Sequence, residues 1–368
     1  MSSQVFFIDF RASMQDNLMR KLSRLLDHAG LAKTVRKRDL VAVKLHFGEM
    51  GNTAHIRPGY LRTIVAEVKA AGGVPFLTDA NTVYAGTRSD APHHLTTAIQ
   101  NGFAYAVVEA PLVIADGLRG KSEVAIPVFG KHFENVYIGR EIVEADALIS
   151  VAHFKGHELS GFGGTLKNLG MGCASRKGKL AMHSTVSPQV KAENCIACGE
   201  CAAHCSQQAL TVNEDQAVID EEKCIGCGEC ILICPNEAID IRWDQEIPTF
   251  LEGMVEYTAG VLKNKAGRGL FVNFINDVSP ACDCYPANDA PIVKNIGILA
   301  SRDPVAVDQA AVDLVNAEPG LAGTRLTANT EPGGDKFKGL YPKVDWPIQL
   351  AYAEKLGLGS RTYSLEQV

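Results

Sequence analysis

The cysteines between residues 195 and 234 constrain this chain more than any other feature. Eight of the eleven cysteines form two copies of the pattern C-x2-C-x2-C-x3-C, and each cysteine recurs 29 residues later. The first copy is Cys195, Cys198, Cys201 and Cys205, and the second is Cys224, Cys227, Cys230 and Cys234. A zinc site usually takes its ligands as two separated pairs, so a duplicated quartet favours another use of these thiolates.

The spacing predicts two [4Fe–4S] clusters that share their ligands crosswise. Three thiolates spaced by two residues hold one cube, and the fourth thiolate of each copy ligates the other cube. The first cysteine set is therefore Cys195, Cys198, Cys201 and Cys234, and the second cysteine set is Cys224, Cys227, Cys230 and Cys205. Over residues 193–243 the chain resembles a bacterial two-cluster ferredoxin domain.

The charge of this stretch differs from that of the rest of the chain. Residues 193–243 carry ten acidic side chains against two basic ones, a balance of −8, whereas the whole chain has 36 − 42 = −6. An acidic module of this kind suits docking on a basic surface of a redox partner protein, and the alternative is a merely solvated face. The net negative charge gives no support to nucleic acid as a partner.

Composition and apolar runs narrow the class of protein further. With 46% hydrophobic and 21% charged residues among 368, the chain has the composition of a folded protein and not of a disordered one. Its apolar runs are far shorter than the ~18 residues that a membrane span needs. The first ten residues lack a basic region and a small-residue cleavage site, so we expect a cytoplasmic protein without a membrane span.

Outside the cysteine-rich stretch, strand-like and helix-like segments alternate. The expected strands are Val5–Phe10, Leu40–Phe47, Val74–Asp79, Ala147–Ala152, Leu270–Ile275 and Ile296–Ala300. The expected helices include Asp16–Ala29, Pro58–Ala71, Ala91–Asn101 and Pro248–Asn264. This rhythm predicts an α/β fold, with a mostly parallel sheet covered by helices on both faces and interrupted by a small α+β ferredoxin-like domain. We expect a host domain over residues 1–187 and 244–368, with an insert at 188–243.

Polar residues gather where the predicted parallel strands end, which is where ligands bind in such sheets. Candidates for anion binding, proton donation or catalysis are Lys44, His46, Asp79, His153, Lys155, His157 and Lys167. Further polar residues follow the last predicted strand, at Ser301–Asp303. A structural role remains the alternative for each histidine, and a metal site at His153 and His157 is a weaker alternative because Gly156 lies between them.

Two further motifs suggest chemistry in the same cleft. The segment 161–168 resembles an anion-binding nest, with Gly161, Gly163, Gly164, Lys167 and Asn168 as its candidate residues; close backbone packing is the alternative. Cys282 and Cys284 are too close in sequence for a comfortable disulfide ring, and in an extended chain they face the same way. Such a pair suits a soft metal, a cluster edge or thiol chemistry, and two buried, inert cysteines are the alternative.

Several stretches resemble the iron–sulfur proteins of the "domain of unknown function 362" family. They include Val43-Lys-Leu-His-Phe-Gly-Glu-Met-Gly-Asn, His153-Phe-Lys-Gly-His, Gly161–Gly172, Cys282-Asp-Cys and the segment that begins at Ile296. The resemblance covers almost the whole chain and implies the architecture and the clusters, but no reaction.

We therefore expect an iron–sulfur redox protein, with the question of enzymatic activity open. Its two clusters pass single electrons to a substrate, cofactor or metal centre in the host cleft, which holds a small anionic ligand or a further metal. One alternative is a non-enzymatic electron carrier that docks to a partner oxidoreductase. Another is a maturation or reductive-activation factor for a metalloprotein, in which Cys282 and Cys284 handle the metal.

Overall fold

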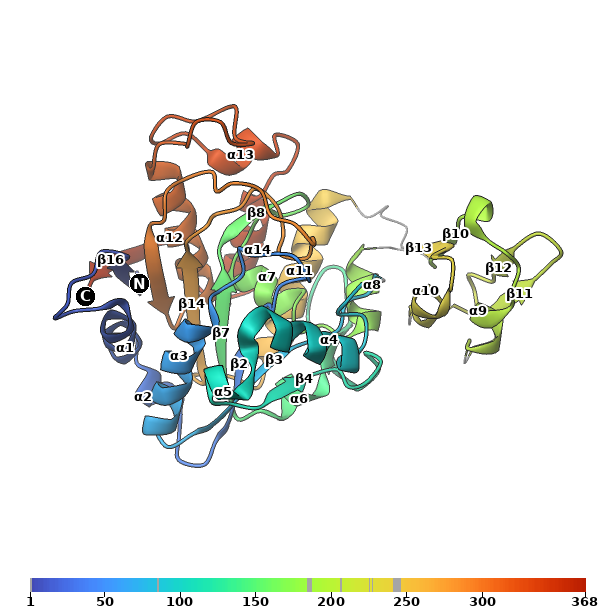
Figure 1. The fold of residues 1–368 in the computed structure, drawn as a ribbon, viewed down its shortest axis with the longest axis horizontal. Helices are drawn as coiled ribbons and strands as arrows, with labels where there is room; N and C mark the ends of the chain where they lie inside the picture. The colour runs from blue at the N-terminus through green and yellow to red at the C-terminus, as the bar shows by residue number, and fades with distance from the viewer. Residues whose placement is uncertain are drawn as a thin grey trace.

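The host is built on one large sheet that helices cover on both faces (Figure 1). The computed structural model describes residues 2–84, 86–183, 187–205, 207–224, 226, 228–240 and 246–368. Its eight-stranded sheet has the order β16-β1-β15-β14-β7-β2-β3-β4. All neighbouring pairs in the sheet are parallel except the two that involve β15. The predicted α/β class with a mostly parallel sheet is therefore confirmed.

The elements lie close to the positions that the sequence predicts. The strands of the large sheet are β1 (Ser3–Asp9), β2 (Leu40–Lys44), β3 (Val74–Asp79), β4 (Leu112–Ile114), β7 (Ala147–His153), β14 (Gly269–Ile275), β15 (Gly297–Ser301) and β16 (Tyr363–Gln367). The longer host helices are α1 (Leu18–His28), α3 (Pro58–Ala70), α4 (Ala91–Ala98), α8 (Arg176–His183), α11 (Ile247–Leu262), α12 (Pro304–Ala317) and α14 (Pro347–Lys355). Shorter host elements are α2 (Leu31–Thr34), η1 (Ile99–Phe103), α5 (Tyr105–Val108), β5 (Glu123–Pro127), β6 (Asn135–Gly139), α6 (Arg140–Glu144), β8 (Lys155–His157), β9 (Gly161–Gly163), α7 (Thr165–Gly170) and α13 (Lys336–Leu340).

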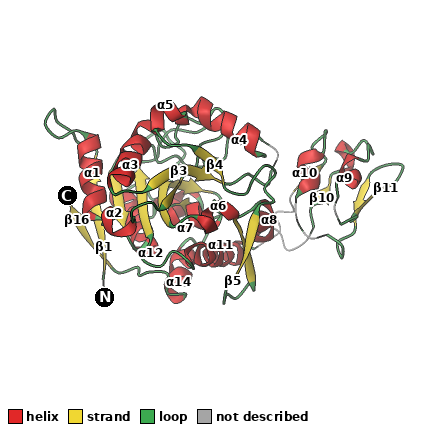
Figure 2. Ribbon diagram, turned by 90° about the horizontal axis from the view of Figure 1, so that it is seen from below, coloured by secondary structure: helices red, strands yellow, loops and turns green. Residues whose placement is uncertain are grey.

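Two hydrophobic cores lie on opposite faces of the sheet. In β2, Val41 and Val43 point into the core shared with α1 and α3, whereas Ala42 points into the core shared with α7, α11 and α12. Figure 2 shows these helices on the two sides of the strands. Strands that are apolar on both faces read as continuous hydrophobic runs, which explains why the sequence revealed them.

The direction of β15 corrects one expectation. This strand runs antiparallel to both of its neighbours, β1 and β14. Its carboxyl end therefore lies at the edge of the sheet opposite to the ends of β2, β3 and β7, so Ser301–Asp303 do not join the predicted cleft. Instead, the carboxylate of Asp303 accepts hydrogen bonds from the amides of Val305 and Ala306 and caps α12.

The cysteine-rich insert forms its own small elements, apart from the large sheet (Figure 1). They are β10 (Gln189–Val190), η2 (Ala192–Asn194), α9 (Glu200–Ala203), β11 (Leu210–Val212), β12 (Ala217–Ile219), α10 (Glu229–Ile233) and β13 (Ile239–Asp240). Strand β10 pairs with β13, and β11 pairs with β12. The predicted boundary between residues 243 and 244 lies outside the described residues. Within the described ranges, no helix combines the length and the apolar character that crossing a membrane requires.

The backbone of the insert repeats with the same period as its cysteines. Positive φ angles occur at Ala197 and Gly226, at Gly199 and Gly228, and at Gln208 and Glu237. The two members of each pair are 29 residues apart. Gly199 and Gly228 precede α9 and α10, respectively, in the left-handed conformation that glycine adopts without a steric cost. The sequence duplication is therefore also a duplication of backbone conformation.

Candidate functional site

A cavity of about 510 Å³ lies at the carboxyl ends of β2, β3 and β7. Its volume falls within the range of small-molecule sites, which is roughly 300–1,000 Å³. The predicted candidates that line it are Lys44, His46, Asp79, His153, Lys155, His157, Gly163, Gly164, Lys167, Asn168 and Cys284. The structure thus brings together residues from separate strand ends. Two candidates do not line the cavity, because Gly161 packs against Trp346 and Cys282, which is bonded to Cys284, is buried.

Buried ion pairs fix one part of the cavity wall. Lys44 Nζ lies 3.1 Å from Asp79 Oδ1, and Arg88 Nε lies 3.1 Å from Glu49 Oε2. Burial alone would raise the pKa of Asp79, but the nearby cations, Lys44 first among them, hold this pKa below its usual value. These charges neutralise one another, so this part of the wall is rigid and polar without carrying a net charge.

A second buried network centres on Asp283. Its carboxylate lies 3.0 Å from His153 Nδ1 and 3.1 Å from Lys155 Nζ. Burial opposes ionisation, yet His153 and Lys155 hold the pKa of Asp283 well below its usual value. Because His153 Nε2 lies 2.8 Å from the carbonyl oxygen of Asn276, both ring nitrogens face acceptors. His153 is thus a positioning residue for the loop that carries Asp283.

Two lysines face the cavity without such neutralisation. Lys167 Nζ contacts Cys282 Sγ, and Lys179 Nζ donates to the carbonyl oxygen of Ala174. Neither amine forms a salt bridge with a carboxylate of the described part of the chain. Burial lowers the pKa of Lys167 to about 7 and that of Lys179 to about 8. Both amines can therefore gain or lose a proton near neutral pH, and in the charged form both favour a bound anion.

Two histidines face the cavity as neutral hydrogen-bond donors. Burial lowers the pKa of His46 and of His157 well below the usual value. His46 Nδ1 accepts from the amide of Gly48 at 3.0 Å, and His157 Nδ1 accepts from the amides of Leu159 and Ser160 at 3.2 Å. Because Nδ1 is the acceptor in each neutral ring, the proton is on Nε2.

The glycine-rich loop differs from the expectation in what occupies it. The amides of Thr165 and Leu166, which begin α7, donate to the two carboxylate oxygens of Asp308 at 2.7 and 2.8 Å. A side chain at Gly164 would collide with the same carboxylate. The anion in this nest is therefore a residue of the chain itself, and Lys167 is the part of the motif that remains available to a ligand.

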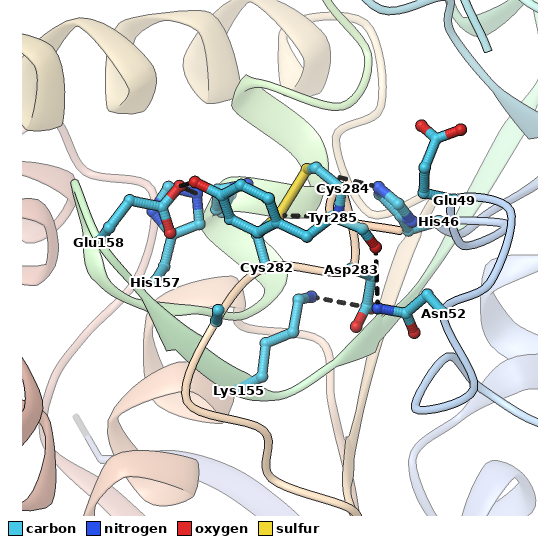
Figure 3. The surroundings of a disulfide bond; sticks show 12 residues. His46, Glu49, Asn52, Lys155, His157, Glu158, Cys282, Asp283, Cys284 and Tyr285 are labelled. Atoms are coloured by element: carbon cyan, nitrogen blue, oxygen red, sulfur yellow. Dashed lines mark hydrogen bonds and ion pairs between the residues drawn. A yellow bond between two sulfur atoms is a disulfide. The ribbon is translucent and has the colours of Figure 1, made fainter. Parts of the chain in front are cut away.

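Cys282 and Cys284 also depart from the expectation, because the structure joins them in a disulfide (Figure 3). The prediction assumed an extended chain, but the segment turns sharply, and the amide of Tyr285 donates to the carbonyl oxygen of Cys282 at 3.2 Å. The turn brings the two Cα atoms to 5.1 Å, a distance that a disulfide can span.

In the insert, the described cysteines surround two small cavities. Cys195, Cys198, Cys201 and Cys234 line one cavity, and Cys205, Cys224 and Cys230 line the other. Cys227, the remaining member of the second cysteine set, lies outside the described residues. No group of three His, Cys, Asp or Glu side chains within the described ranges converges on a single metal position. A cubane takes one thiolate at each iron, so its ligands surround a volume and do not converge on one point.

Backbone amides point at the sulfur atoms of the insert. The amides of Ala209 and Ala238 donate to Cys205 Sγ at 3.3 Å and to Cys234 Sγ at 3.2 Å. These two hydrogen bonds are again 29 residues apart. A third amide, that of Ala217, donates to Cys195 Sγ at 3.4 Å. Such N–H···S hydrogen bonds stabilise thiolates, and they tune the reduction potential of a cluster that the thiolates ligate.

The second cysteine set lies against the host next to the cavity. Arg119 Nη1 and Lys121 Nζ lie 3.0 and 3.1 Å from the carboxylate of Glu229, which precedes Cys230. Val83 of the host packs in one hydrophobic cluster with Cys230 and also lines the cavity.

Helix α8 separates the insert from the cavity and contacts both. Leu180 packs with the hydrophobic residues of the insert, and Arg176 lies 3.9 Å from the carboxylate of Glu229. Lys179 and His183, on the same helix, line the cavity. Figure 1 shows α8 on the side of the host that faces α10.

The sequence did not reveal Phe250 as a residue of the cavity. Phe250 comes from α11, far along the chain, and stacks on His183 with 5.0 Å between the ring centroids. Tyr84 and Arg88 follow β3, and the guanidinium of Arg88 donates to the hydroxyl of Tyr84 at 2.7 Å. The position of Tyr84 and Arg88 after a strand end is the sequence signal that predicts a place at the cavity, whereas Phe250 gave no signal because a helix core residue has the same pattern.

Solved structures and one protein family resemble this chain, whereas no curated protein matches it. Among solved structures, it is similar to the lactate racemase apoprotein of Thermoanaerobacterium thermosaccharolyticum, with 16% identity and a TM-score of 0.39 over 70% of this chain and 49% of the racemase. It is also similar to a protein of Thermotoga maritima, with 8% identity and a TM-score of 0.32 over 92% of this chain and 58% of that one. The chain thus spans about half the length of the racemase. A family model matches residues 41–313, and the chain therefore belongs to the family described as Domain of unknown function (DUF362).

Proposed function

We propose that this protein is an iron–sulfur redox protein that passes single electrons through two [4Fe–4S] clusters to an anionic ligand in the host cavity. The observation that carries the proposal is the position of the second cysteine set against the cavity wall, where Glu229 pairs with host cations and Val83 contacts both sides. A free electron carrier has no need for such a fixed position.

The residues of the insert fit the two clusters in three respects. The described members of each predicted ligand set line one cavity. Amides donate to the sulfur atoms of Cys195, Cys205 and Cys234. The glycines before α9 and α10 take left-handed conformations, which let the backbone approach a bound group closely. When bound, the clusters supply one-electron transfer at potentials that range from roughly −700 to +450 mV.

In the host cavity, the chain binds the ligand and supplies protons. Lys167 and Lys179 attract the anion, and the ion pairs of Lys44 and Arg88 keep the wall in place. His46 and His157 each present an Nε2–H group. With a pKa of about 7, Lys167 can also release a proton as negative charge arrives on the ligand.

The first test is the cluster content of protein purified without oxygen. We expect about eight iron and eight sulfide per chain, as two cubanes require, and an electron paramagnetic resonance signal after reduction with dithionite. Zinc in place of iron would refute the proposal at this step.

The second test is a potentiometric titration with and without sulfate, used as a simple dianion. An anion bound next to a cluster disfavours the added electron, so sulfate should make the midpoint potential of one cluster more negative. Lys167→Met should remove this effect. If sulfate leaves both potentials unchanged at every concentration, the cavity is not coupled to the clusters and the electron-carrier alternative is favoured.

A further inference from the structure

The disulfide of Cys282 and Cys284 divides its two sulfur atoms between the cavity and the core. Cys284 is partly exposed and lines the cavity, whereas Cys282 is 2% exposed. Figure 3 shows the pair beside His46 and the network around Asp283. Thiol–disulfide exchange by a dithiol requires these two positions. One sulfur must be accessible to attack the substrate, and the other must lie close enough to attack the mixed disulfide and resolve it.

The cavity-facing sulfur has a hydrogen-bond donor. His46 Nε2 lies 3.7 Å from Cys284 Sγ. Since the Nδ1 atom of this neutral ring accepts from the amide of Gly48, Nε2 carries the hydrogen and donates toward the sulfur. A donor in this position stabilises a thiolate at Cys284 over a thiol.

The buried sulfur has a proton source. Lys167 Nζ lies 3.7 Å from Cys282 Sγ. Burial, with a smaller contribution from the nearby Lys155, lowers the pKa of this amine to about 7. Lys167 can therefore give a proton to the Cys282 sulfur near neutral pH and take the same proton back when Cys282 is deprotonated again.

We propose that Cys282–Cys284 is a redox-active disulfide, the two-electron centre of the cavity, and that its substrate is a small anionic disulfide. Two electrons cleave the S–S bond, Cys282 takes a proton from Lys167 to become a thiol, and Cys284 becomes a thiolate next to His46. The electrons come one at a time from the reduced clusters, and this source rests on the proposed function.

The second half of the cycle regenerates the disulfide. The Cys284 thiolate attacks the bound disulfide R–S–S–R, forms a mixed disulfide and releases RS⁻. Cys282 then attacks Cys284 Sγ, the Cys282–Cys284 bond forms again, and the second RS⁻ leaves as the proton of Cys282 passes to Lys167. The sum of these steps is R–S–S–R plus two electrons to two RS⁻, and the released thiolates take two protons from solvent to give two R–SH. The amines of Lys167 and Lys179 form no salt bridge with a carboxylate of the described residues, and in the charged form they favour an anionic substrate over a neutral one.

The first experiment needs no cluster. The protein is equilibrated without oxygen in mixtures of lipoate and dihydrolipoate and then alkylated with iodoacetamide. The mass of the tryptic peptide 269–294 is measured by mass spectrometry, since this peptide contains Cys282 and Cys284 and no other cysteine. We expect the peptide to change from unlabelled to doubly labelled as the mixture becomes more reducing, with faster exchange for lipoate than for its neutral amide. A peptide that is doubly labelled in every mixture, or labelled in none, would overturn the proposal.

Two serine variants test the division of labour. In Cys282→Ser, the free Cys284 should be alkylated at least about tenfold faster than the free Cys282 in Cys284→Ser, because exposure and thiolate character control the rate. Equal rates contradict the assigned roles. Labelling that requires a chelator in the wild-type protein would show a bound metal in place of the disulfide and would also overturn the proposal.

A separate experiment tests the source of the electrons. After anaerobic reduction of the cluster-loaded protein, the peptide 269–294 should become doubly labelled. The rate of this labelling should be lower in Glu229→Gln, which keeps every predicted cluster ligand. Cys205→Ser, which removes a ligand of the second cluster, should slow it further. If the pair responds to dihydrolipoate but not to the reduced clusters, the disulfide is redox-active and the proposed electron path is wrong. If it responds to neither, the disulfide proposal itself fails.

Discussion

The Nη1 atom of Arg119 lies 3.0 Å from the Oε1 atom of Glu229, so a residue of the host pairs with the residue that precedes Cys230. Arg119 is largely exposed, but Glu229 is buried, and Lys121 and Arg176 approach the same carboxylate. A surface ion pair alone contributes about 0–1 kcal/mol to stability. The carboxylate of Glu229 is buried among three cations, so it fixes the position of Glu229 relative to the host. This contact holds the second cysteine set against the host, where Val83 packs with Cys230 and lines the cavity.

Replacement of Glu229 should therefore change the second cluster. Glu229→Gln removes a negative charge beside Cys230 and leaves the cations of Arg119 and Lys121 without their partner. The midpoint potential of one cluster should become more positive, as measured by potentiometric titration. Glu214→Gln, an exposed charge change in the same insert, is the matched control and should have little effect. Equal shifts in the two variants contradict a specific contact.

The crosswise ligand assignment predicts which variants damage which cluster. Cys234→Ser should disturb the cluster held by Cys195, although Cys234 follows the second motif. Cys205→Ser should disturb the cluster held by Cys224. Each variant should lose roughly half of the iron, and the two residual resonance spectra should differ. Cys173→Ser is the control, because Cys173 is buried in the host core and should leave the iron content unchanged. Complete retention of iron in Cys234→Ser speaks against the assignment.

Asp308 should be important for stability. Its carboxylate accepts from the amides of Thr165 and Leu166 and from the side chain of Asn273. Asp308→Ala leaves two buried amides without acceptors, which should lower the free energy of unfolding by about 2–4 kcal/mol. Urea denaturation measures this change. Asp313→Ala, on the exposed side of the same helix, should cost about 1 kcal/mol or less. A cost for Asp308→Ala as small as that of the control would contradict the structural role of the carboxylate.

Anion binding in the cavity should weaken as pH rises. The pKa of Lys167 is lowered to about 7 and that of Lys179 to about 8, so both amines are charged below pH 7 and neutral above pH 9. Sulfate keeps its charge over this range, and its affinity should therefore fall between pH 6 and pH 9 as these lysines lose their protons. Calorimetric titration measures it. In Lys167→Met the affinity should be lower and the change with pH smaller, and an unchanged profile in this variant would exclude Lys167 as the responsible group.

Much of the fold could be predicted because the strands are apolar on both faces. Val74–Asp79, for example, forms a strand with the predicted bounds. The direction of β15 could not be predicted, since it depends on pairing with β1 and β14, which lie far away in the sequence. For the same reason Ser301–Asp303 were placed in the wrong part of the molecule.

The candidate site was predictable where a residue follows a parallel strand. Lys44, Asp79 and His153 reach the cavity for this reason. The sequence could not show that the carboxylate of Asp308 accepts hydrogen bonds from the amides after Gly164, because the two segments meet only in the folded chain. It also could not show the turn that joins Cys282 to Cys284.

The most direct test of the account is Mössbauer spectroscopy of protein enriched in iron-57 and isolated without oxygen. The account predicts that cubane [4Fe–4S] clusters account for nearly all of the iron, at about eight iron atoms per chain. Iron bound as isolated tetrathiolate centres, or sites filled by zinc, would contradict it.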